Sequence, residues 1–181
     1  MSEIEFVPFP KIARLNREVI VTEKIDGTNA CVYVSESGGI RAGSRTRWIT
    51  PEDDNFGFAR WVAEHVEELR TLGPGTHHGE WWGSGIQRKY GLSEKRFSLF
   101  NTSAWSDEAG KRPACCGVVP VLGVGTNIRD VVENALTELR YHGSRAAPGF
   151  MKPEGVVAWH TAARVMFKVT LERDEEPKGK P

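Results

Sequence analysis

Apolar residues, many of them β-branched, recur at short intervals along the chain in the pattern typical of β-strands. The predicted strands are 18–23, 30–35, 40–45, 96–100, 117–121, 155–160 and 164–171. A turn at 36–39 joins the second of these strands to the third. The segment 24–29 therefore lies between two predicted strands.

Two longer segments have the helical spacing of apolar residues instead. The first begins with Thr50 as N-cap and Pro51 at the first helical position, and it continues to Leu69. The second stops at Gly143, and its apolar face consists of Ile128, Val131, Val132, Ala135 and Leu139. Strands in hairpins together with these helices predict an α+β fold with antiparallel sheets and flanking helices, not an alternating parallel fold.

Composition indicates one globular domain of ordinary size. With 39% hydrophobic residues among 181, the chain can bury a single core. We expect the domain to cover 1–171 and the charged, proline-containing segment 172–181 to be a mobile tail. Lys and Arg number 24, as do Asp and Glu. A surface that binds nucleic acid would therefore have to be a local basic patch.

The start of the chain and its cysteines bear on cellular location. The first ten residues have no apolar stretch behind a basic start, so they predict neither a signal peptide nor a membrane span. Cys31 stands in an apolar run, and Cys115 and Cys116 are adjacent, which matches no usual zinc pair or disulfide framework. A cytoplasmic protein with reduced thiols and no membrane partner is expected.

The candidate chemistry begins at the segment that follows the first predicted strand. In Lys24-Ile25-Asp26-Gly27, a lysine emerges from a strand end and Asp-Gly forms a tight turn after it. Alone, such a match is only moderately specific. Further short segments follow it in order: Gly43-Ser44-Arg45-Thr46, Gly79-Glu80-Trp81-Trp82-Gly83, Phe97-Ser98-Leu99-Phe100, Pro153-Glu154-Gly155-Val156-Val157 and Phe167-Lys168-Val169.

Together these segments resemble the covalent nucleotidyltransferase superfamily of ligases and RNA-capping enzymes, over roughly residues 8 to 170. Lys-x-Asp-Gly followed by Thr28-Asn29 looks like the RNA ligases, since DNA ligases and capping enzymes usually carry Arg at the place of Asn29. The resemblance implies the nucleotidyltransferase (adenylation) fold, with the nucleotide in the groove between antiparallel sheets. It also implies ATP-dependent RNA joining through a covalent lysyl-AMP and an adenylylated 5′ end.

The resemblance assigns catalytic roles to three residues. Lys24 would be the nucleophile, which needs a neutral amine. Glu154 has the hard carboxylate oxygens that suit Mg²⁺ or Mn²⁺ between phosphates. Lys168 would neutralise the α-phosphate. The position two residues later, where the family commonly has a second lysine, holds Thr170, so charge neutralisation is expected to be weaker.

The same resemblance predicts the nucleotide contacts. They are Glu23, Ile25, Asn29, Arg45, Glu80, Phe100 and Lys168. The Glu80 carboxylate suits ribose hydroxyls, although an ordinary surface glutamate would look the same. Phe100 corresponds to the aromatic that stacks on adenine, but Phe97 and Phe100 are equally compatible with core positions of their strand. Alternation places these two side chains on opposite faces.

Contacts with RNA are assigned more weakly. Arg45, Arg88 and Lys89 can bind phosphates, yet solvated basic positions are as compatible with the sequence. The pair His77-His78 reads as an exposed loop and receives no role. Many relatives have a further C-terminal domain that helps to bind the nucleic acid, whereas thirteen residues follow Lys168 in this sequence. RNA recognition is therefore expected from the catalytic domain or a partner. The RNA could be a nicked duplex or an RNA/DNA hybrid.

Two alternatives stay open at this stage. A capping-type guanylyltransferase would share Lys24, Glu80 and Glu154 but use GTP, and Asn29 speaks against it. A non-catalytic nucleic-acid-binding module would keep the fold without the chemistry, and Thr170 leaves room for it.

Overall fold

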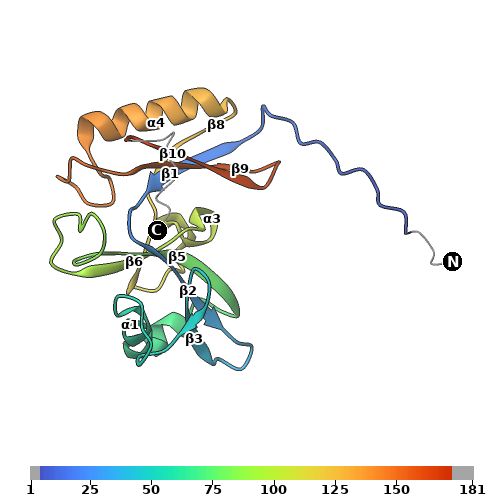
Figure 1. The fold of residues 1–181 in the computed structure, drawn as a ribbon. Helices are drawn as coiled ribbons and strands as arrows, with labels where there is room; N and C mark the ends of the chain where they lie inside the picture. The colour runs from blue at the N-terminus through green and yellow to red at the C-terminus, as the bar shows by residue number, and fades with distance from the viewer. Residues whose placement is uncertain (1–4, 173–181) are drawn as a thin grey trace.

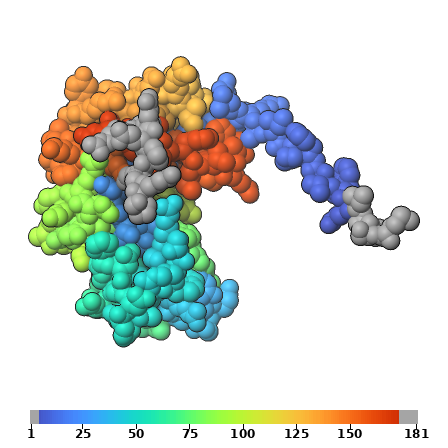
Figure 2. Space-filling view, in the orientation of Figure 1, coloured from blue at the N-terminus to red at the C-terminus, as the bar shows by residue number. Residues whose placement is uncertain are grey.

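Two β-sheets lie one above the other, each with helices on its outer face (Figure 1). This computed structural model describes residues 5–172. Of the predicted tail 172–181, only Glu172 is among them, so the prediction of a mobile tail lies outside the described residues. Figure 2 shows the two layers as an upper and a lower part of the surface, with the segment that precedes β1 projecting from the upper one.

The first sheet has four antiparallel strands in the order β10-β9-β1-β8. Their bounds are β1 Val19–Lys24, β8 Val121–Gly125, β9 Gly155–His160 and β10 Val165–Thr170. Helix α4, Ile128–His142, covers the outer face and packs its buried Ala135, Leu136 and Leu139 against Val21 and Val156. Its first turn is capped by Asn127, whose side chain accepts a hydrogen bond from the amide of Arg129.

The second sheet has the order β4-β3-β2-β5-β6-β7. Its strands are β2 Thr28–Val34, β3 Ile40–Ser44, β4 Trp48–Ile49, β5 Gly75–Gly83, β6 Lys95–Leu99 and β7 Cys116–Val118. Neighbouring strands are antiparallel except β6 and β7. Helices α1, Phe58–Glu64, and α2, Val66–Arg70, cover its outer face, while α3, Thr102–Trp105, and the 3₁₀ turn Asp107–Ala109 connect β6 to β7. The α+β class with antiparallel sheets is thus confirmed.

Three local predictions were wrong. The first helix begins at Phe58 rather than after Thr50, because Gly57 caps it in a left-handed conformation and the Asp54 carboxylate accepts hydrogen bonds from the amides of Ala59 and Arg60. The helix is also interrupted at His65, which separates α1 from α2.

The segment 117–121 was predicted as one strand but contributes to two, β7 and β8, which belong to different sheets. The segment 75–83, which includes His77 and His78, is not a loop but β5, a central strand of the second sheet. It has buried residues on both faces at its C-terminal end, so it lacks the alternation that marks a half-buried strand.

The chain passes between the sheets at two places that lie side by side. Residues 25–27 lead from β1 to β2, and residues 119–120 lead from β7 to β8. The amide of Glu23 donates to the carbonyl of Pro120 at 2.9 Å. Ile25 and Val119 are buried in one cluster with Trp82 and Tyr90. The two covalent links between the layers are therefore packed together beside the end of β1.

Two further findings bear on the sequence analysis. Cys31, Cys115 and Cys116 are free thiols. Among residues 5–172, no helix has both the length and the apolar character needed to cross a bilayer.

Candidate active site

The inner face of the first sheet, opposite α4, presents Lys24 and Lys168. Val21 and Ala158 face α4, so alternation turns Thr22 and Lys24 toward the second sheet. Lys24 is in register with Gly155, and Gly155 with Thr170. Lys168 is in register with Val157, which in turn pairs with Thr22, and it is exposed. Lys24, Lys168 and Thr170 therefore share one face, and Thr170 lies directly across from Lys24 with one strand between them.

The ammonium of Lys24 is paired with the carboxylate of Glu154. Lys24 Nζ lies 2.6 Å from Glu154 Oε2, and the side chains are 20% and 1% exposed. Glu154 immediately precedes β9, the strand that pairs with β1. Gly155 permits this close packing, because a Cβ there would collide with the carbonyl of Val169 and lie 2.7 Å from Thr170 Cα. Paired strands thus bring the lysine and the carboxylate to the same end of the ladder.

Glu80 of β5 extends the site on the second sheet. Its Oε1 accepts a hydrogen bond from the amide of Gly27 at 3.1 Å, and its Oε2 accepts one from Asn29 Nδ2 at 2.9 Å. Burial raises the pKa of Glu80 to about 7, with Asn29, Lys24 and the Gly27 amide lowering it and Glu154 raising it. The structure therefore brings Lys24, Asn29, Glu80 and Glu154 together, although Glu80 and Glu154 come from different sheets.

Glu23 and Ile25, on either side of Lys24, face into the protein. The Glu23 carboxylate accepts hydrogen bonds from Ser144 Oγ at 2.5 Å and from the amides of Arg145 and Ala146, both at 2.8 Å. Burial raises the pKa of Glu23. Ile25 is buried at the crossing between the sheets. Both side chains hold the segment that carries Lys24, and their contacts with a nucleotide stay predictions.

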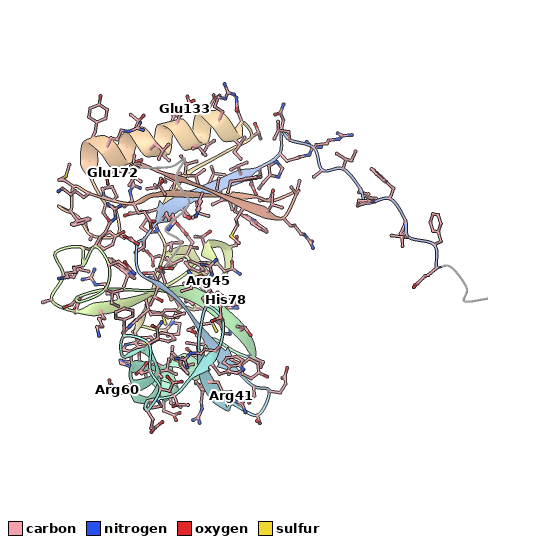
Figure 3. The ribbon with its side chains drawn as sticks, viewed as in Figure 1. Arg41, Arg45, Arg60, His78, Glu133 and Glu172 are labelled. Atoms are coloured by element: carbon pink, nitrogen blue, oxygen red, sulfur yellow. The ribbon has the colours of Figure 1, made fainter. Side chains whose placement is uncertain are left out.

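Phe100 and Arg45 lie at the rim of the second sheet. Phe100 follows β6 and is 40% exposed, whereas Phe97 and Leu99 are buried in the core cluster under α1. Its amide donates to the carbonyl of His78 at 3.0 Å. Arg45 follows β3 and is exposed, and Figure 3 shows it in the same region of the view as His78. An exposed aromatic ring and an exposed guanidinium are available there, as their predicted roles require.

Arg88 and Lys89 belong to the connection between β5 and β6. Lys89 is exposed, but Arg88 Nε donates to Asp26 Oδ2 at 3.0 Å and Nη1 donates to the carbonyl of Lys152 at 3.0 Å. A contact of either residue with RNA stays a prediction.

Sequence reasoning missed Tyr90, a buried residue that contacts the turn after Lys24. The amide of Asp26 donates to its hydroxyl at 2.7 Å, and burial raises the pKa of this tyrosine. Tyr90 has φ 52°, a left-handed conformation that is uncommon for an aromatic residue. No periodicity marks such a residue, and only the flanking glycines at 85 and 91 signal an irregular loop.

Comparison with protein families agrees with this arrangement. The model of the RNA ligase family matches residues 17–170, which include every strand of both sheets. The chain belongs to the RNA ligase family. No curated protein matches it.

Solved RNA ligases from Naegleria gruberi share the fold of the present chain. A variant solved with ATP and Mn is 20% identical, with a TM-score of 0.64 over 87% of this chain and 51% of that chain. A variant with AMP and Mn is also 20% identical, with a TM-score of 0.60 over 86% and 50%. The present chain thus spans about half the length of these structures. At this identity the likeness concerns the fold, a mixed α+β arrangement with antiparallel sheets.

Proposed function

We propose that this chain is the catalytic part of an ATP-dependent RNA ligase in which Lys24 carries AMP as a covalent intermediate. The observation that supports the proposal most directly is the contact of Lys24 with Glu154, beside the Glu80 carboxylate that Asn29 and Gly27 hold. A lysine beside two carboxylates from two sheets is an arrangement in which a nucleotide can be bound between the layers and attacked from one side.

Lys24 would act through its uncharged amine. In the structure Lys24 donates a hydrogen bond to Glu154, and attack on phosphorus needs the lone pair of a neutral amine, so a proton must leave Lys24 before attack. The Lys24 Nζ–phosphorus bond then forms at the α-phosphate while the bond to pyrophosphate breaks. In the second step a 5′-phosphate oxygen takes AMP and the phosphorus–nitrogen bond breaks. In the third step a 3′-hydroxyl displaces AMP and closes the phosphodiester.

The other predicted residues would bind and orient the nucleotide. Glu80 accepts hydrogen bonds and would take ribose hydroxyls at the inner end of the site. Phe100 offers an exposed ring for stacking on adenine. Lys168, on the same face as Lys24, would meet the negative charge that grows on the α-phosphate. Arg45 would hold the ribose or the 5′-phosphate with its forked donors.

The proposed divalent cation is held by Glu154 together with substrate phosphates, and not by a complete set of protein ligands. Among the described residues there is no group of three His, Cys, Asp or Glu side chains placed to hold a metal ion. Mg²⁺ is commonly held by one or two carboxylates and substrate phosphates, and Glu154 already faces a cation, the Lys24 ammonium. A bound ion would supply neutralisation of phosphate charge. The ATP and Mn in the solved relatives support this choice of nucleotide and cation.

RNA as the substrate rests on the family and on Asn29. The RNA ligase model covers most of the chain, and Asn29 stands where arginine is usual in DNA ligases and capping enzymes. In the structure its side-chain amide donates to Glu80, which supports a role for this position beside the nucleotide. A nicked duplex, including an RNA/DNA hybrid, is the proposed substrate, bound with help from Arg45 and Lys89.

The test is to incubate the purified chain with ATP and Mg²⁺ and to measure its intact mass and peptide map. One AMP on Lys24, with little adduct from GTP, is the expected result. An equal adduct from GTP would favour the capping-type guanylyltransferase. Absence of any adduct in a folded protein would favour a non-catalytic RNA-binding module, and an adduct on another lysine would refute the assignment.

A further inference from the structure

The guanidinium of Arg88 contacts three segments of the chain that adjoin strands of the first sheet. Nε bonds to Asp26 in the turn after Lys24, and Nη1 bonds to the carbonyl of Lys152 in the segment before Glu154, both at 3.0 Å. Nη2 lies 4.0 Å from Glu172 Oε2, just beyond β10. Arg88 itself belongs to the connection from β5 to β6, so one side chain links the second sheet to three strand ends of the first.

These links lie where the β-ladder no longer holds the chain. The pairing of β1 with β9 ends at Lys24 and Gly155. Beyond that pair, Asp26 lies in the link from β1 to the second sheet, and Lys152 lies in the segment that leads into β9. A planar guanidinium with several fixed donors can hold both at once, which a point charge cannot. With Asp26 15% exposed and Arg88 26% exposed, the pair is also shielded from much of the screening that weakens surface ion pairs.

The loop that presents Arg88 is unusually constrained. Gln87, Lys89 and Tyr90 all have positive φ, at 42°, 59° and 52°. Such conformations cost energy and persist where the surroundings impose them. Buried Ile86 and Tyr90 hold the loop from both sides of Arg88, and Tyr90 accepts the amide of the same Asp26. Arg88 is thus flanked on both sides by residues in left-handed conformations.

We propose that Arg88 is a positioning residue, which fixes the Lys24 amine relative to Glu154 for attack on the α-phosphate and does not itself bind RNA. The inference rests on the proposed function, because it concerns the step in which Lys24 takes AMP. Its effect belongs to the rate of that step and not to nucleotide affinity, since none of its bonds reaches Glu80, Asn29 or Phe100. Small misplacement of a reacting group can lower a rate about 100-fold.

The experiment measures AMP transfer to Lys24 in single turnover without RNA, over a range of ATP concentrations, for Arg88→Ala, Arg88→Lys, Arg88→Gln and Asp26→Asn. Arg112→Ala is the matched control. Arg112 also joins an aspartate, Asp107, at 2.5 Å and a carbonyl, that of Trp105, at 2.7 Å, with a similar exposure of 23% and no contact with the site. Melting temperatures are recorded for every variant.

We expect Arg88→Ala to slow transfer at saturating ATP by about 10- to 100-fold, with half-saturating ATP changed by less than about 3-fold. Arg88→Lys should recover only part of the rate. The double variant Arg88→Ala/Asp26→Asn should be no slower than Arg88→Ala alone, because Asp26→Asn weakens one of the links that Arg88→Ala already removes. Arg112→Ala should keep the wild-type rate.

The inference fails if Arg88→Ala transfers AMP as fast as Arg112→Ala, if its defect lies in half-saturating ATP, or if the two single defects multiply. Should Arg88→Ala not fold, Arg88→Lys and Arg88→Gln decide the question by the same criteria. A wild-type chain that takes no AMP would instead refute the proposed function, and that result is obtained before any variant is compared.

Discussion

Lys24 Nζ lies 2.6 Å from Glu154 Oε2, and the residue next to Glu154, Gly155, is the ladder partner of Lys24. The pairing of these two strands thus brings the amine and the carboxylate to the same end of the ladder. Either side chain can be replaced without altering the hydrogen-bonded pairs of the ladder itself. The first two predictions use this property.

Lys24→Ala should separate the steps of ligation. The variant is expected not to join a 5′-phosphate nick with ATP, because no amine accepts AMP. It should still seal a nick whose 5′ end already carries AMP, at a reduced rate, because that step has no covalent role for Lys24. A gel assay of both substrates measures this. Complete loss of sealing on the adenylylated nick in a well-folded variant would contradict a role confined to covalent catalysis.

Glu154→Ala should impair both reactions. The attacking 3′-hydroxyl and the leaving AMP develop charge in the sealing step, as pyrophosphate does in the first, and a cation held by this carboxylate would stabilise both. We expect a loss of about 100-fold or more in each rate. The two substrates above, assayed over a series of Mg²⁺ and Mn²⁺ concentrations, measure it. Normal sealing of the adenylylated nick would place the role of Glu154 in the first step alone.

Phe100→Ala should weaken the use of ATP more than Phe100→Leu does, since leucine keeps some apolar contact with the base. A stacked ring contributes about 1 kcal/mol beyond its area, so we expect apparent ATP affinity to fall roughly 5- to 10-fold in the alanine variant. Because the ring is 40% exposed, both variants should melt near the wild-type temperature. Unchanged ATP affinity with normal melting would transfer the stacking role to another aromatic residue.

Glu80→Gln should change how stability depends on pH. Burial raises the pKa of Glu80 from 4.5 to about 7, so the folded wild type holds a proton that the unfolded chain releases between these values. The resulting stabilisation is complete below pH 4.5 and is lost as pH rises through 7. Relative to wild type, Glu80→Gln should therefore gain up to about 3 kcal/mol in unfolding free energy from pH 4.5 to above 7. Urea unfolding across this range tests the sign, and parallel curves for the two proteins would contradict it.

Gly27→Ala should destabilise the fold as well as the site. A Cβ at Gly27 would collide with the carbonyl of Trp81 and lie 2.7 Å from Trp82 Cβ and 3.0 Å from Glu80 Cγ. Overpacking of this kind costs about 1–3 kcal/mol. Gly117→Ala is the control, because its nearest neighbour would be the Ser98 hydroxyl at 3.1 Å. Denaturant midpoints of the two variants decide, and equal midpoints would show that the crossing can relax.

Strong periodicity made part of the fold predictable from the sequence. Helix α4 and strands β1 and β9 each bury one face, so apolar positions recur at the expected spacing. Strand β5 was missed because Trp81 and Trp82 are buried on opposite faces and its N-terminal half contains no β-branched run. The split of 117–121 was missed because short strands in two sheets share one apolar run.

Sequence motifs pointed to residues that the structure brings together, but not to the contacts that connect them. Lys24, Glu80 and Glu154 stand in short motifs, and the structure brings them together between the sheets, while their roles stay predictions. The link from Arg88 to Asp26 spans 62 positions and depends on a loop with left-handed residues, for which the sequence gives no period. The same holds for Ser144, which holds the buried Glu23 carboxylate from 121 positions away.

The chain crosses between the two stacked sheets at residues 25–27 and 119–120, and these crossings lie together beside Lys24 (Figure 1). The covalent links between the sheets are therefore confined to one line. Points near the axis of a rotation move least. A rotation of one sheet against the other about this line would displace the edge strands, such as β4 or β10, far more than the amine of Lys24. Lys24 thus lies close to this axis, where its position changes little with the angle between the two sheets.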